Sequence, residues 1–299
     1  MLGTRAASLF PTAALLVVTA VWGSTFFMIK GLVTTIPSLD FLGIRFAIAA
    51  AVVILWRWKD LLGVSGKTWR RRIILALIFS AGQILQTIGL ETTAASISGF
   101  LTGLYVVFTP LLAAVLLREQ LGRRVWIAEA MASAGLAFLS LQGLTFSAGA
   151  GVTVLAAVLY AFHVLFLSQW APDENPATLA FIQVVAAGAL LGMAALPSGV
   201  VLPRTPAAWG AILCMALIAG LLVVFLQTWA QARLTAPTAA VIMTTEPVFA
   251  TMFAIMFGGE SLTLRIAGGG ALVLAAMFVV EGGTSPDGAS KKETRARAQ

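Results

Sequence analysis

Charged residues are scarce in this sequence, and so are cysteine and histidine. Only 10% of the 299 residues carry a charge, against roughly 25% in an ordinary globular protein. Hydrophobic residues make up 60%, and a water-soluble fold could not cover its surface with so few charges. A fold that faces lipid can, because its outer surface must be apolar. The composition therefore predicts an integral membrane protein.

The shortage of ligand and catalytic residue types narrows the possible chemistry. Cys214 is the only cysteine, which excludes an internal disulfide and a multi-cysteine metal site. His163 is the only histidine, too few for a metal-dependent membrane enzyme. A serine–lysine or aspartyl-dyad mechanism would need buried partners, and Glu246 is the only acid expected deep in the membrane. We therefore expect no cofactor, no metal and no catalytic residue, and an integral membrane enzyme remains only as the alternative of another class.

Long apolar runs divide the chain. A spanning helix needs about 20 largely apolar residues. Such runs lie near residues 11–32, 38–58, 72–91, 95–117, 124–142, 150–170, 176–197, 207–231, 237–258 and 264–281. Their connections are short, so neighbouring helices should be antiparallel. The sequence predicts an all-α fold of about ten transmembrane helices.

The segments outside these runs are short. The first run is too long for the core of a signal peptide and lacks a cleavage pattern, so residues 1–10 are expected to form a cytoplasmic N-terminus. Residues 284–299 are rich in Ser, Gly and charge, which predicts a disordered cytoplasmic tail.

Basic residues indicate the orientation. The net charge of +7 could suggest nucleic acid, but Lys and Arg lie in short loops, where they set membrane orientation instead. The richest segments hold Arg57, Lys59, Lys67, Arg70, Arg71 and Arg72 in one loop, Arg118, Arg123 and Arg124 in another, and Lys291, Lys292, Arg295 and Arg297 after the last run. We expect this side to be the cytoplasm, with both termini inside. One loop on that side, Asp173-Glu174, is acidic, but acids carry little weight in this rule.

The two halves of the sequence resemble each other. One ungapped alignment places Leu85-Gln86-Thr87 on Leu226-Gln227-Thr228, Val107-Phe108 on Val248-Phe249 and Glu119 on Glu260. A weaker alignment pairs Trp22 with Tyr160, Thr25 with His163 and Arg45 with Gln183. Chance matching of apolar helices is the competing explanation, and the polar matches argue against it. Each half, 11–142 and 150–281, holds an odd number of spans, so the second should be inverted, as in alternating-access carriers that bind substrate between inverted repeats.

Short motifs recur in a set order. Trp22-Gly23-Ser24-Thr25-Phe26, Pro37, Arg45-Phe46, Pro110 and Arg118-Glu119-Gln120-Leu121 lie in the first half, and Glu246-Pro247-Val248-Phe249 and Gly258-Gly259-Glu260-Ser261-Leu262 in the second. Their order, spacing and duplication resemble the EamA repeat of the drug/metabolite transporter superfamily over nearly the whole chain before the tail. The resemblance implies a ten-helix carrier with one central cavity, for amino acids, other metabolites, nucleotide sugars or drugs. The chain looks most like bacterial amino-acid exporters of the YddG type, although Tyr160-Ala161-Phe162 replaces the Trp-Gly pair at the start of the second half.

Polar and aromatic side chains at membrane depth mark the candidate site, because each is costly there. The glutamine amides suit the carboxylate and ammonium of a zwitterion, and the aromatic rings could stack on a flat substrate. We predict a substrate cavity lined by Trp22, Gln83, Gln86, Ser98, Thr102, Tyr105, Tyr160, His163, Gln227 and Glu246. The competing interpretations are helix–helix hydrogen bonds for the glutamines, an interfacial belt for the aromatics and a core role for the histidine.

Two charged residues are expected deep in the bilayer. Glu246 precedes Pro247, which frees a carbonyl and can bend a helix, so this carboxyl either plugs the kink or carries a coupling proton. Arg45 should lie roughly 10 Å deep, where it either forms a structural ion pair or attracts a substrate carboxylate. We favour the structural role for both. Glu119 and Glu260 lie at span ends, where capping or loop roles are expected.

The favoured function is a carrier that exports small organic metabolites, amino acids including aromatic ones, by alternating access. The alternative within transport is a multidrug or cationic-compound exporter, but such proteins often place an acid early in the first helix, and none occurs here before Lys30. Neither Glu246 nor His163 has a charged partner nearby in sequence, so facilitated diffusion or exchange is expected rather than obligatory proton coupling. The expected partners are the small-molecule substrate and membrane lipid, and the expected state is a monomer.

Topology gives the first testable prediction. Because the basic loop between residues 59 and 72 should be cytoplasmic, single cysteines in place of Ser65 and Ser198 should label from opposite sides of intact cells. Labelling of both from outside would contradict the orientation and the inverted repeat together.

Overall fold

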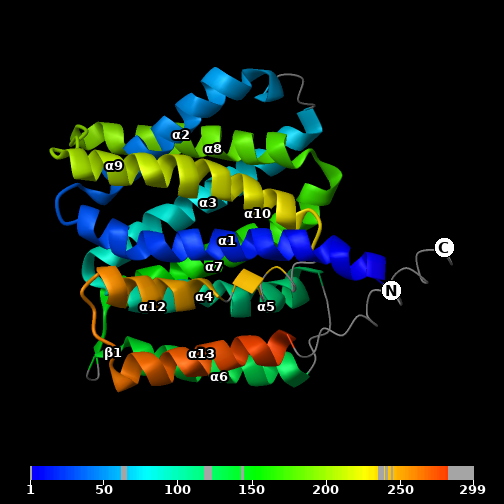
Figure 1. Cartoon of the computed structure of the whole chain (residues 1–299), viewed down its shortest axis with the longest axis vertical. Helices are drawn as coiled ribbons and strands as arrows, with labels where there is room; N and C mark the ends of the chain where they lie inside the picture. Colours follow the sequence, from blue (N-terminus) through cyan, green and yellow to red (C-terminus); the bar gives the residue numbers. More distant parts are fainter. Residues whose placement is uncertain are drawn as a thin grey trace.

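The chain forms a bundle of long helices that lie side by side (Figure 1). This computed structural model describes residues 2–61, 66–117, 123–142, 145–234, 239, 242–243 and 245–281. Several subjects of the sequence analysis lie outside the described residues: Ser65, the motif Arg118-Glu119-Gln120-Leu121, part of the predicted span 237–258, and the segment 284–299.

The first half of the chain contributes six helices to the described structure. They are α1 (Leu2–Leu32), α2 (Ser38–Leu61), α3 (Gly66–Thr92), α4 (Ala95–Gly103), α5 (Tyr105–Leu117) and α6 (Arg123–Ser140). A pair of two-residue strands, β1 (Leu141–Gln142) and β2 (Thr145–Phe146), is antiparallel and follows α6. This small hairpin is a departure from the purely helical prediction, which extended the fifth span to residue 142.

The second half begins at α7 (Ala148–Trp170). It continues through the short turn η1 (Ala171–Asp173), α8 (Pro176–Ala195), the turn η2 (Leu196–Ser198), α9 (Pro206–Cys214), the π-helix η3 (Met215–Leu222), α10 (Val223–Gln231), α12 (Glu246–Phe257) and α13 (Leu264–Glu281). Local sequence explains where several of these helices start. Asn175 and Thr205 cap the backbone of α8 and α9, and each is followed by a proline in the first turn, where the missing N–H has no cost.

Most of these helices could cross a bilayer. Seven within the described residues are long and apolar enough: Leu9–Leu32, Ser38–Lys59, Trp69–Thr92, Ala95–Leu116, Ala148–Asp173, Pro176–Ala195 and Pro206–Gln231. Two further apolar helices, Glu246–Phe257 and Leu264–Ala276, are shorter. Large hydrophobic side chains such as Leu55 and Trp56 face outward, each more than four-fifths exposed (82% and 81%). Their exposure suits lipid rather than water, and the protein is a helical, multi-pass membrane protein.

Two predicted spans are interrupted rather than continuous. The span predicted at 95–117 divides at Leu104 into α4 and α5. The span predicted at 207–231 contains the eight-residue π-helix η3 between α9 and α10. Hydropathy could not predict either feature, because continuous and interrupted helices bury the same apolar side chains.

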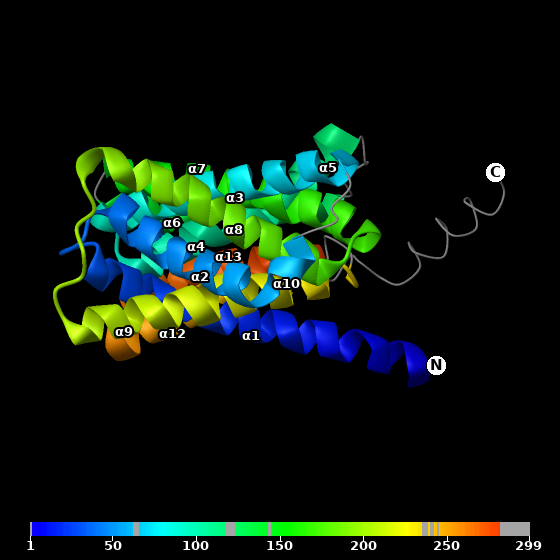
Figure 2. The ribbon, with the colours of Figure 1, turned by 90° about the horizontal axis from the view of Figure 1, so that it is seen from above.

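The start of α1, the end of α13, the end of α2 and the start of α3 gather at one end of the bundle (Figure 1). Figure 2 shows the start of α1 extending beyond its neighbours at that end. The arrangement agrees with the loop assignment made from the Lys and Arg residues.

The acidic connection that disagreed with the charge rule is explained by ion pairs. Arg72 Nε donates to Glu174 Oε2 at 2.7 Å, and the two side chains are only 7% and 2% exposed. Arg71 Nη1 lies 3.5 Å from Asp173 Oδ2 in an exposed pair. The acids therefore lie beside the start of α3, on the same side as the basic residues whose charge they balance.

The opposite end of the bundle is held by helix caps. The Glu260 carboxylate accepts hydrogen bonds from the backbone N–H groups of Ala95 and Ser96 and from the Ser96 hydroxyl. This carboxylate covers the N-terminus of α4, the capping role expected for it. Lys30 Nζ donates to the carbonyl oxygens of Leu90 and Glu91 at 2.7 and 3.1 Å, at the C-terminus of α3. A cation is favourable there because it meets carbonyls that have no helical partner.

The buried ion pair predicts a stability difference. Glu174→Ala leaves the Arg72 guanidinium buried without its partner, and removing one member of a buried pair costs about 3–5 kcal/mol. Asp173→Ala removes an exposed pair, which contributes about 0–1 kcal/mol. Thermal unfolding in detergent should therefore show a clear drop for the first variant and almost none for the second. Equal melting temperatures would mean that the buried pair does not stabilise the fold.

Candidate substrate cavity

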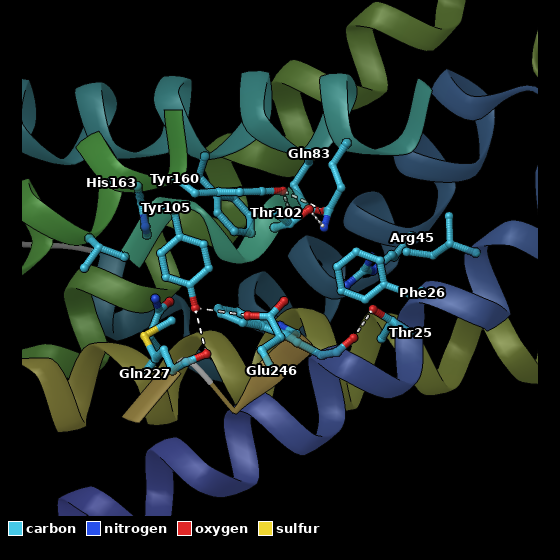
Figure 3. Close-up of a pocket in the computed structure, with 16 residues that line it drawn as sticks. Thr25, Phe26, Arg45, Gln83, Thr102, Tyr105, Tyr160, His163, Gln227 and Glu246 are labelled. Atoms are coloured by element: carbon cyan, nitrogen blue, oxygen red, sulfur yellow. Dashed lines mark hydrogen bonds between the residues drawn. The ribbon is translucent and has the colours of Figure 1, made fainter. Parts of the chain in front are cut away.

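One pocket inside the bundle is lined by most of the predicted site residues. All the predicted residues except Ser98 line it: Trp22, Gln83, Gln86, Thr102, Tyr105, Tyr160, His163, Gln227 and Glu246. They come from α1, α3, α4, α5, α7, α10 and α12, so helices of both halves meet here (Figure 3).

The pocket is narrow in this conformation. Its cavity volume is about 40 Å³. A water molecule needs roughly 10–15 Å³ by the same measure, so the open space suits about three waters. A larger solute can enter only if the surrounding helices or side chains move apart.

An amide–hydroxyl chain crosses one wall of the pocket. Gln83 Nε2 donates to Tyr160 Oη at 2.9 Å, and Tyr160 Oη donates to Gln86 Oε1 at 2.8 Å. Gln86 Nε2 in turn lies 3.4 Å from Thr102 Oγ1. These bonds join α3, α7 and α4, so the helix–helix interpretation of Gln83 and Gln86 is realised even though both side chains line the pocket.

A glycine makes room for this chain. A Cβ atom on Gly82 would lie 2.7 Å from Cε1 of Tyr160, closer than carbon atoms pack. The bare backbone of α3 therefore lets the tyrosine ring approach it closely, with its hydroxyl bonded to both glutamines. Gly82 sets the position of Tyr160 without itself entering the pocket.

A second polar contact joins the two halves. Tyr105 Oη lies 3.2 Å from both Glu246 Oε2 and the carbonyl oxygen of Met243, as Figure 3 shows. The tyrosine and the glutamate are 141 positions apart, the same shift that aligns Gln86 with Gln227. They also begin equivalent helices, α5 and α12.

The segment just before Pro247, where the sequence predicts a bend, includes residues 235–238, 240–241 and 244, which lie outside the described residues. Pro247 lies in the first turn of α12, where a proline loses no helical hydrogen bond. Glu246 is the first residue of α12. The kink-plug role expected for this carboxyl stays a prediction.

Two side chains that line the pocket, those of Trp22 and Arg45, donate hydrogen bonds to the π-helix η3. Trp22 Nε1 donates to the carbonyl oxygen of Ala219 at 3.0 Å. Arg45 Nε donates to the carbonyl oxygen of Met215 at 3.3 Å, and its guanidinium lies 5.0 Å from the centroid of the Phe46 ring. π-Helical turns are rare and frequently occur at functional sites.

His163 has the neutral partner expected of a core histidine. Its Nε2 lies 2.8 Å from Gln183 Oε1, its ring lies 5.4 Å from the Phe79 ring, and it is 3% exposed. The weaker alignment of the two halves pairs Gln183 with Arg45, so the partner of His163 occupies the position that corresponds to Arg45. His163 thus lines the pocket, whereas Gln183 is not among the lining residues.

Ser98 is the predicted cavity residue that the pocket excludes. It is fully buried on α4, and its hydroxyl has no hydrogen-bond partner among the described residues. Ser98 shares a helix face with Thr102, as predicted, but lies about one turn, or 6 Å, further along the helix. Sharing a face was not enough, because the pocket is shorter than the helix.

Seven lining residues are absent from the predicted cavity, although one of them, Arg45, is considered in the sequence analysis as a group that could attract a substrate carboxylate. They are Thr25, Phe26, Ile29, Arg45, Phe79, Val164 and Met243. Trp22, Thr25 and Ile29 follow a spacing of three and four residues, so extending the Trp22 face along α1 would have found two of them. The other apolar residues carry no signal that separates a cavity wall from ordinary core.

Comparison with known proteins identifies the family. The model of the EamA-like transporter family matches residues 10–141 and matches again at residues 147–281. The chain belongs to the EamA-like transporter family. Membership of a transporter family argues against the enzyme alternative.

Individual relatives agree with that assignment. This EamA-like protein is 27% identical over 272 residues to a protein of Archaeoglobus fulgidus named an uncharacterized transporter, covering 91% of this chain and 86% of the relative. It also shares its fold with a solved crystal structure at a TM-score of 0.64 and 18% identity, covering 92% of this chain and 96% of the other.

The two corresponding glutamines should behave differently when each is replaced by leucine. Gln86→Leu breaks the chain through Tyr160 and should lower the free energy of unfolding by about 1–2 kcal/mol. Gln227 Oε1 is buried without a partner among the described residues, so Gln227→Leu should leave stability unchanged or raised. Thermal unfolding in detergent measures both, and counterflow in liposomes should show a weaker apparent affinity for both variants. Unchanged transport in both would exclude substrate contact by these amides.

Proposed function

We propose that this protein is a secondary transporter that exports small organic metabolites, namely amino acids including aromatic ones, across the inner membrane by alternating access. The observation that carries the proposal is the buried pocket, in which polar groups from both halves of an apolar bundle converge. Carriers bind their substrates in such a place, near the midplane and between repeats.

The proposed architecture is about ten spans in two inverted five-helix repeats. The seven long apolar helices, together with α6, α12 and α13, make up these spans. Support comes from the double match of the family and from the contact between Tyr105 and Glu246. Equivalent residues of two repeats contact each other only close to the axis that relates them, and these two are hydrogen-bonded.

The lining supports an amino acid as substrate. The aromatic side chains of Trp22, Tyr105 and Tyr160 surround a centre that also holds amide groups. Aromatic rings suit a flat apolar side chain, and amides suit the polar head of an amino acid. The narrowness of the pocket supports alternating access, because a solute must be admitted by movement of the walls.

The placement of charge supports cytoplasmic termini. The ends of α1 and α13 lie with the α2–α3 connection, where Arg71 and Arg72 are found, and the positive-inside rule assigns that side to the cytoplasm. We propose a monomer that works in contact with membrane lipid, with a small molecule rather than nucleic acid as its partner.

A multidrug or cationic-compound exporter is the second candidate, and one observation favours it. Glu246 is 4% exposed and lines the pocket, so it could attract a cation. Arg45 lines the same pocket and would repel that cation, which is why the amino-acid proposal ranks first.

Counterflow in liposomes tests the proposed function. Liposomes that contain the purified protein and are preloaded with unlabelled L-phenylalanine should take up labelled L-phenylalanine faster than protein-free liposomes do. The same counterflow assay with other amino acids, with sugars and with the cation ethidium identifies the substrate class. Exchange of ethidium without exchange of any amino acid would replace the first proposal with the second.

The energy source gives a further prediction. Glu246 bonds Tyr105 and His163 bonds Gln183, so among the described residues neither has a charged hydrogen-bond partner that could exchange its proton. We expect facilitated diffusion or exchange, with no uphill accumulation when a pH gradient is imposed under clamped voltage. Gradient-driven accumulation that Glu246→Gln or His163→Ala abolishes would show proton coupling and identify the coupling residue.

A further inference from the structure

Two side chains of opposite charge line the pocket without pairing. Arg45 projects from α2 and Glu246 from the start of α12, and both are almost fully buried, at 3% and 4% exposed. Among the described residues no carboxylate lies within 4.0 Å of the arginine, and no basic group lies within that distance of the glutamate. Figure 3 shows the two side chains approaching the pocket from different helices.

Arg45 retains unused donors. Its Nε–H is bonded to the Met215 carbonyl oxygen, and Phe46 supports the guanidinium plane. A guanidinium has five N–H donors in a fixed fork, and within the described structure those on the two Nη atoms have no acceptor. The Met215 carbonyl and the Phe46 ring thus orient the guanidinium. They leave its two Nη atoms free, and a guanidinium can bind a carboxylate through paired hydrogen bonds.

Glu246 has acceptor oxygens on its side of the pocket. Its Oε2 accepts from Tyr105, and the buried Gln227 Oε1, also in the lining, has no partner among the described residues. A carboxylate and an amide oxygen together suit an ammonium group, which has three donors and no acceptor.

A buried charge is costly unless it is paired, and intramembrane ionisable residues mark substrate pathways. We propose that Arg45 binds the carboxylate of a zwitterionic substrate and that Glu246, with Gln227, binds its ammonium group. This assignment rests on the proposed transport of amino acids and makes the two charges the determinants of its specificity. The structural role of Arg45 at Met215 continues alongside, because it uses only Nε.

Three compounds with the same phenyl ring test the assignment. L-Phenylalanine carries both charges, phenethylamine lacks the carboxylate, and 3-phenylpropanoate lacks the ammonium. Their affinities for purified protein can be measured by calorimetry, with ligand-induced shifts of the melting temperature as a second readout. The wild-type protein should bind L-phenylalanine about 10- to 100-fold more tightly than either analogue.

Reciprocal losses are the expected signature. Arg45→Gln should lower the affinity for L-phenylalanine to that for phenethylamine and leave phenethylamine binding within about 2-fold. Glu246→Gln should lower the affinity for L-phenylalanine to the affinity for 3-phenylpropanoate, and it should change the affinity for 3-phenylpropanoate by no more than about 2-fold. The factor of 2 is the scatter expected when no charged hydrogen bond is removed.

Control variants separate recognition from structure. Arg57→Gln removes another arginine of α2 that also lies over a phenyl ring, that of Phe181, but outside the pocket lining, and it should leave all three affinities unchanged. Arg45→Lys keeps the positive charge and should retain part of the preference for L-phenylalanine over phenethylamine; it decides the question if Arg45→Gln does not fold.

The possible failures are distinguishable. Equal losses for all three compounds in Arg45→Gln, or in Arg45→Lys if that is the variant that folds, would make the arginine purely structural and overturn the assignment alone. No binding of any compound to the wild-type protein, with no amino-acid counterflow, would overturn the proposed function and the assignment with it.

Discussion

Inside a bilayer every polar group must find its partner within the protein, and this constraint organises the whole structure. It explains why helices make up nearly all of the described chain, since a helix satisfies its own backbone. Where a helix departs from regular geometry or ends, side chains form hydrogen bonds with its backbone groups. Trp22 and Arg45 bond carbonyls of the π-helix η3, and Glu260 covers the start of α4. The irregular backbone is therefore found beside the pocket and at the helix ends, where such side chains reach it.

The same constraint distinguishes charges that have a charged partner or lie at a helix end from charges that have neither. Arg72 and Glu174 form a buried ion pair at one end of the bundle, and Lys30 donates to helix carbonyls at the other. Arg45 and Glu246 are as buried as the Arg72–Glu174 pair, yet within the described structure each bonds only neutral groups. This separation of opposite charges is the basis of the zwitterion-binding role proposed for them.

Sequence patterns could pick out the polar residues that line the pocket because polar residues stand out against an apolar background. Gln86, Tyr160 and Glu246 were visible as exceptions within their spans, and the pocket contains them. Apolar lining residues such as Phe79 and Val164 gave no such signal, because a cavity wall and a helix interface have the same composition. Ser98 failed for a geometric reason, since a helix face extends beyond the pocket.

The sequence by itself determined the membrane class, the approximate spans, the basic end and the duplicated pattern, because each depends on composition over a local window or on matching windows. Only the tertiary structure decided which helix faces meet: that Tyr105 contacts Glu246, that Asp173 and Glu174 join Arg71 and Arg72, and that one span widens into a π-helix. The physical reason is range. Transfer from water to lipid is a property of each segment, whereas hydrogen bonds and ion pairs depend on distances between residues far apart in the chain.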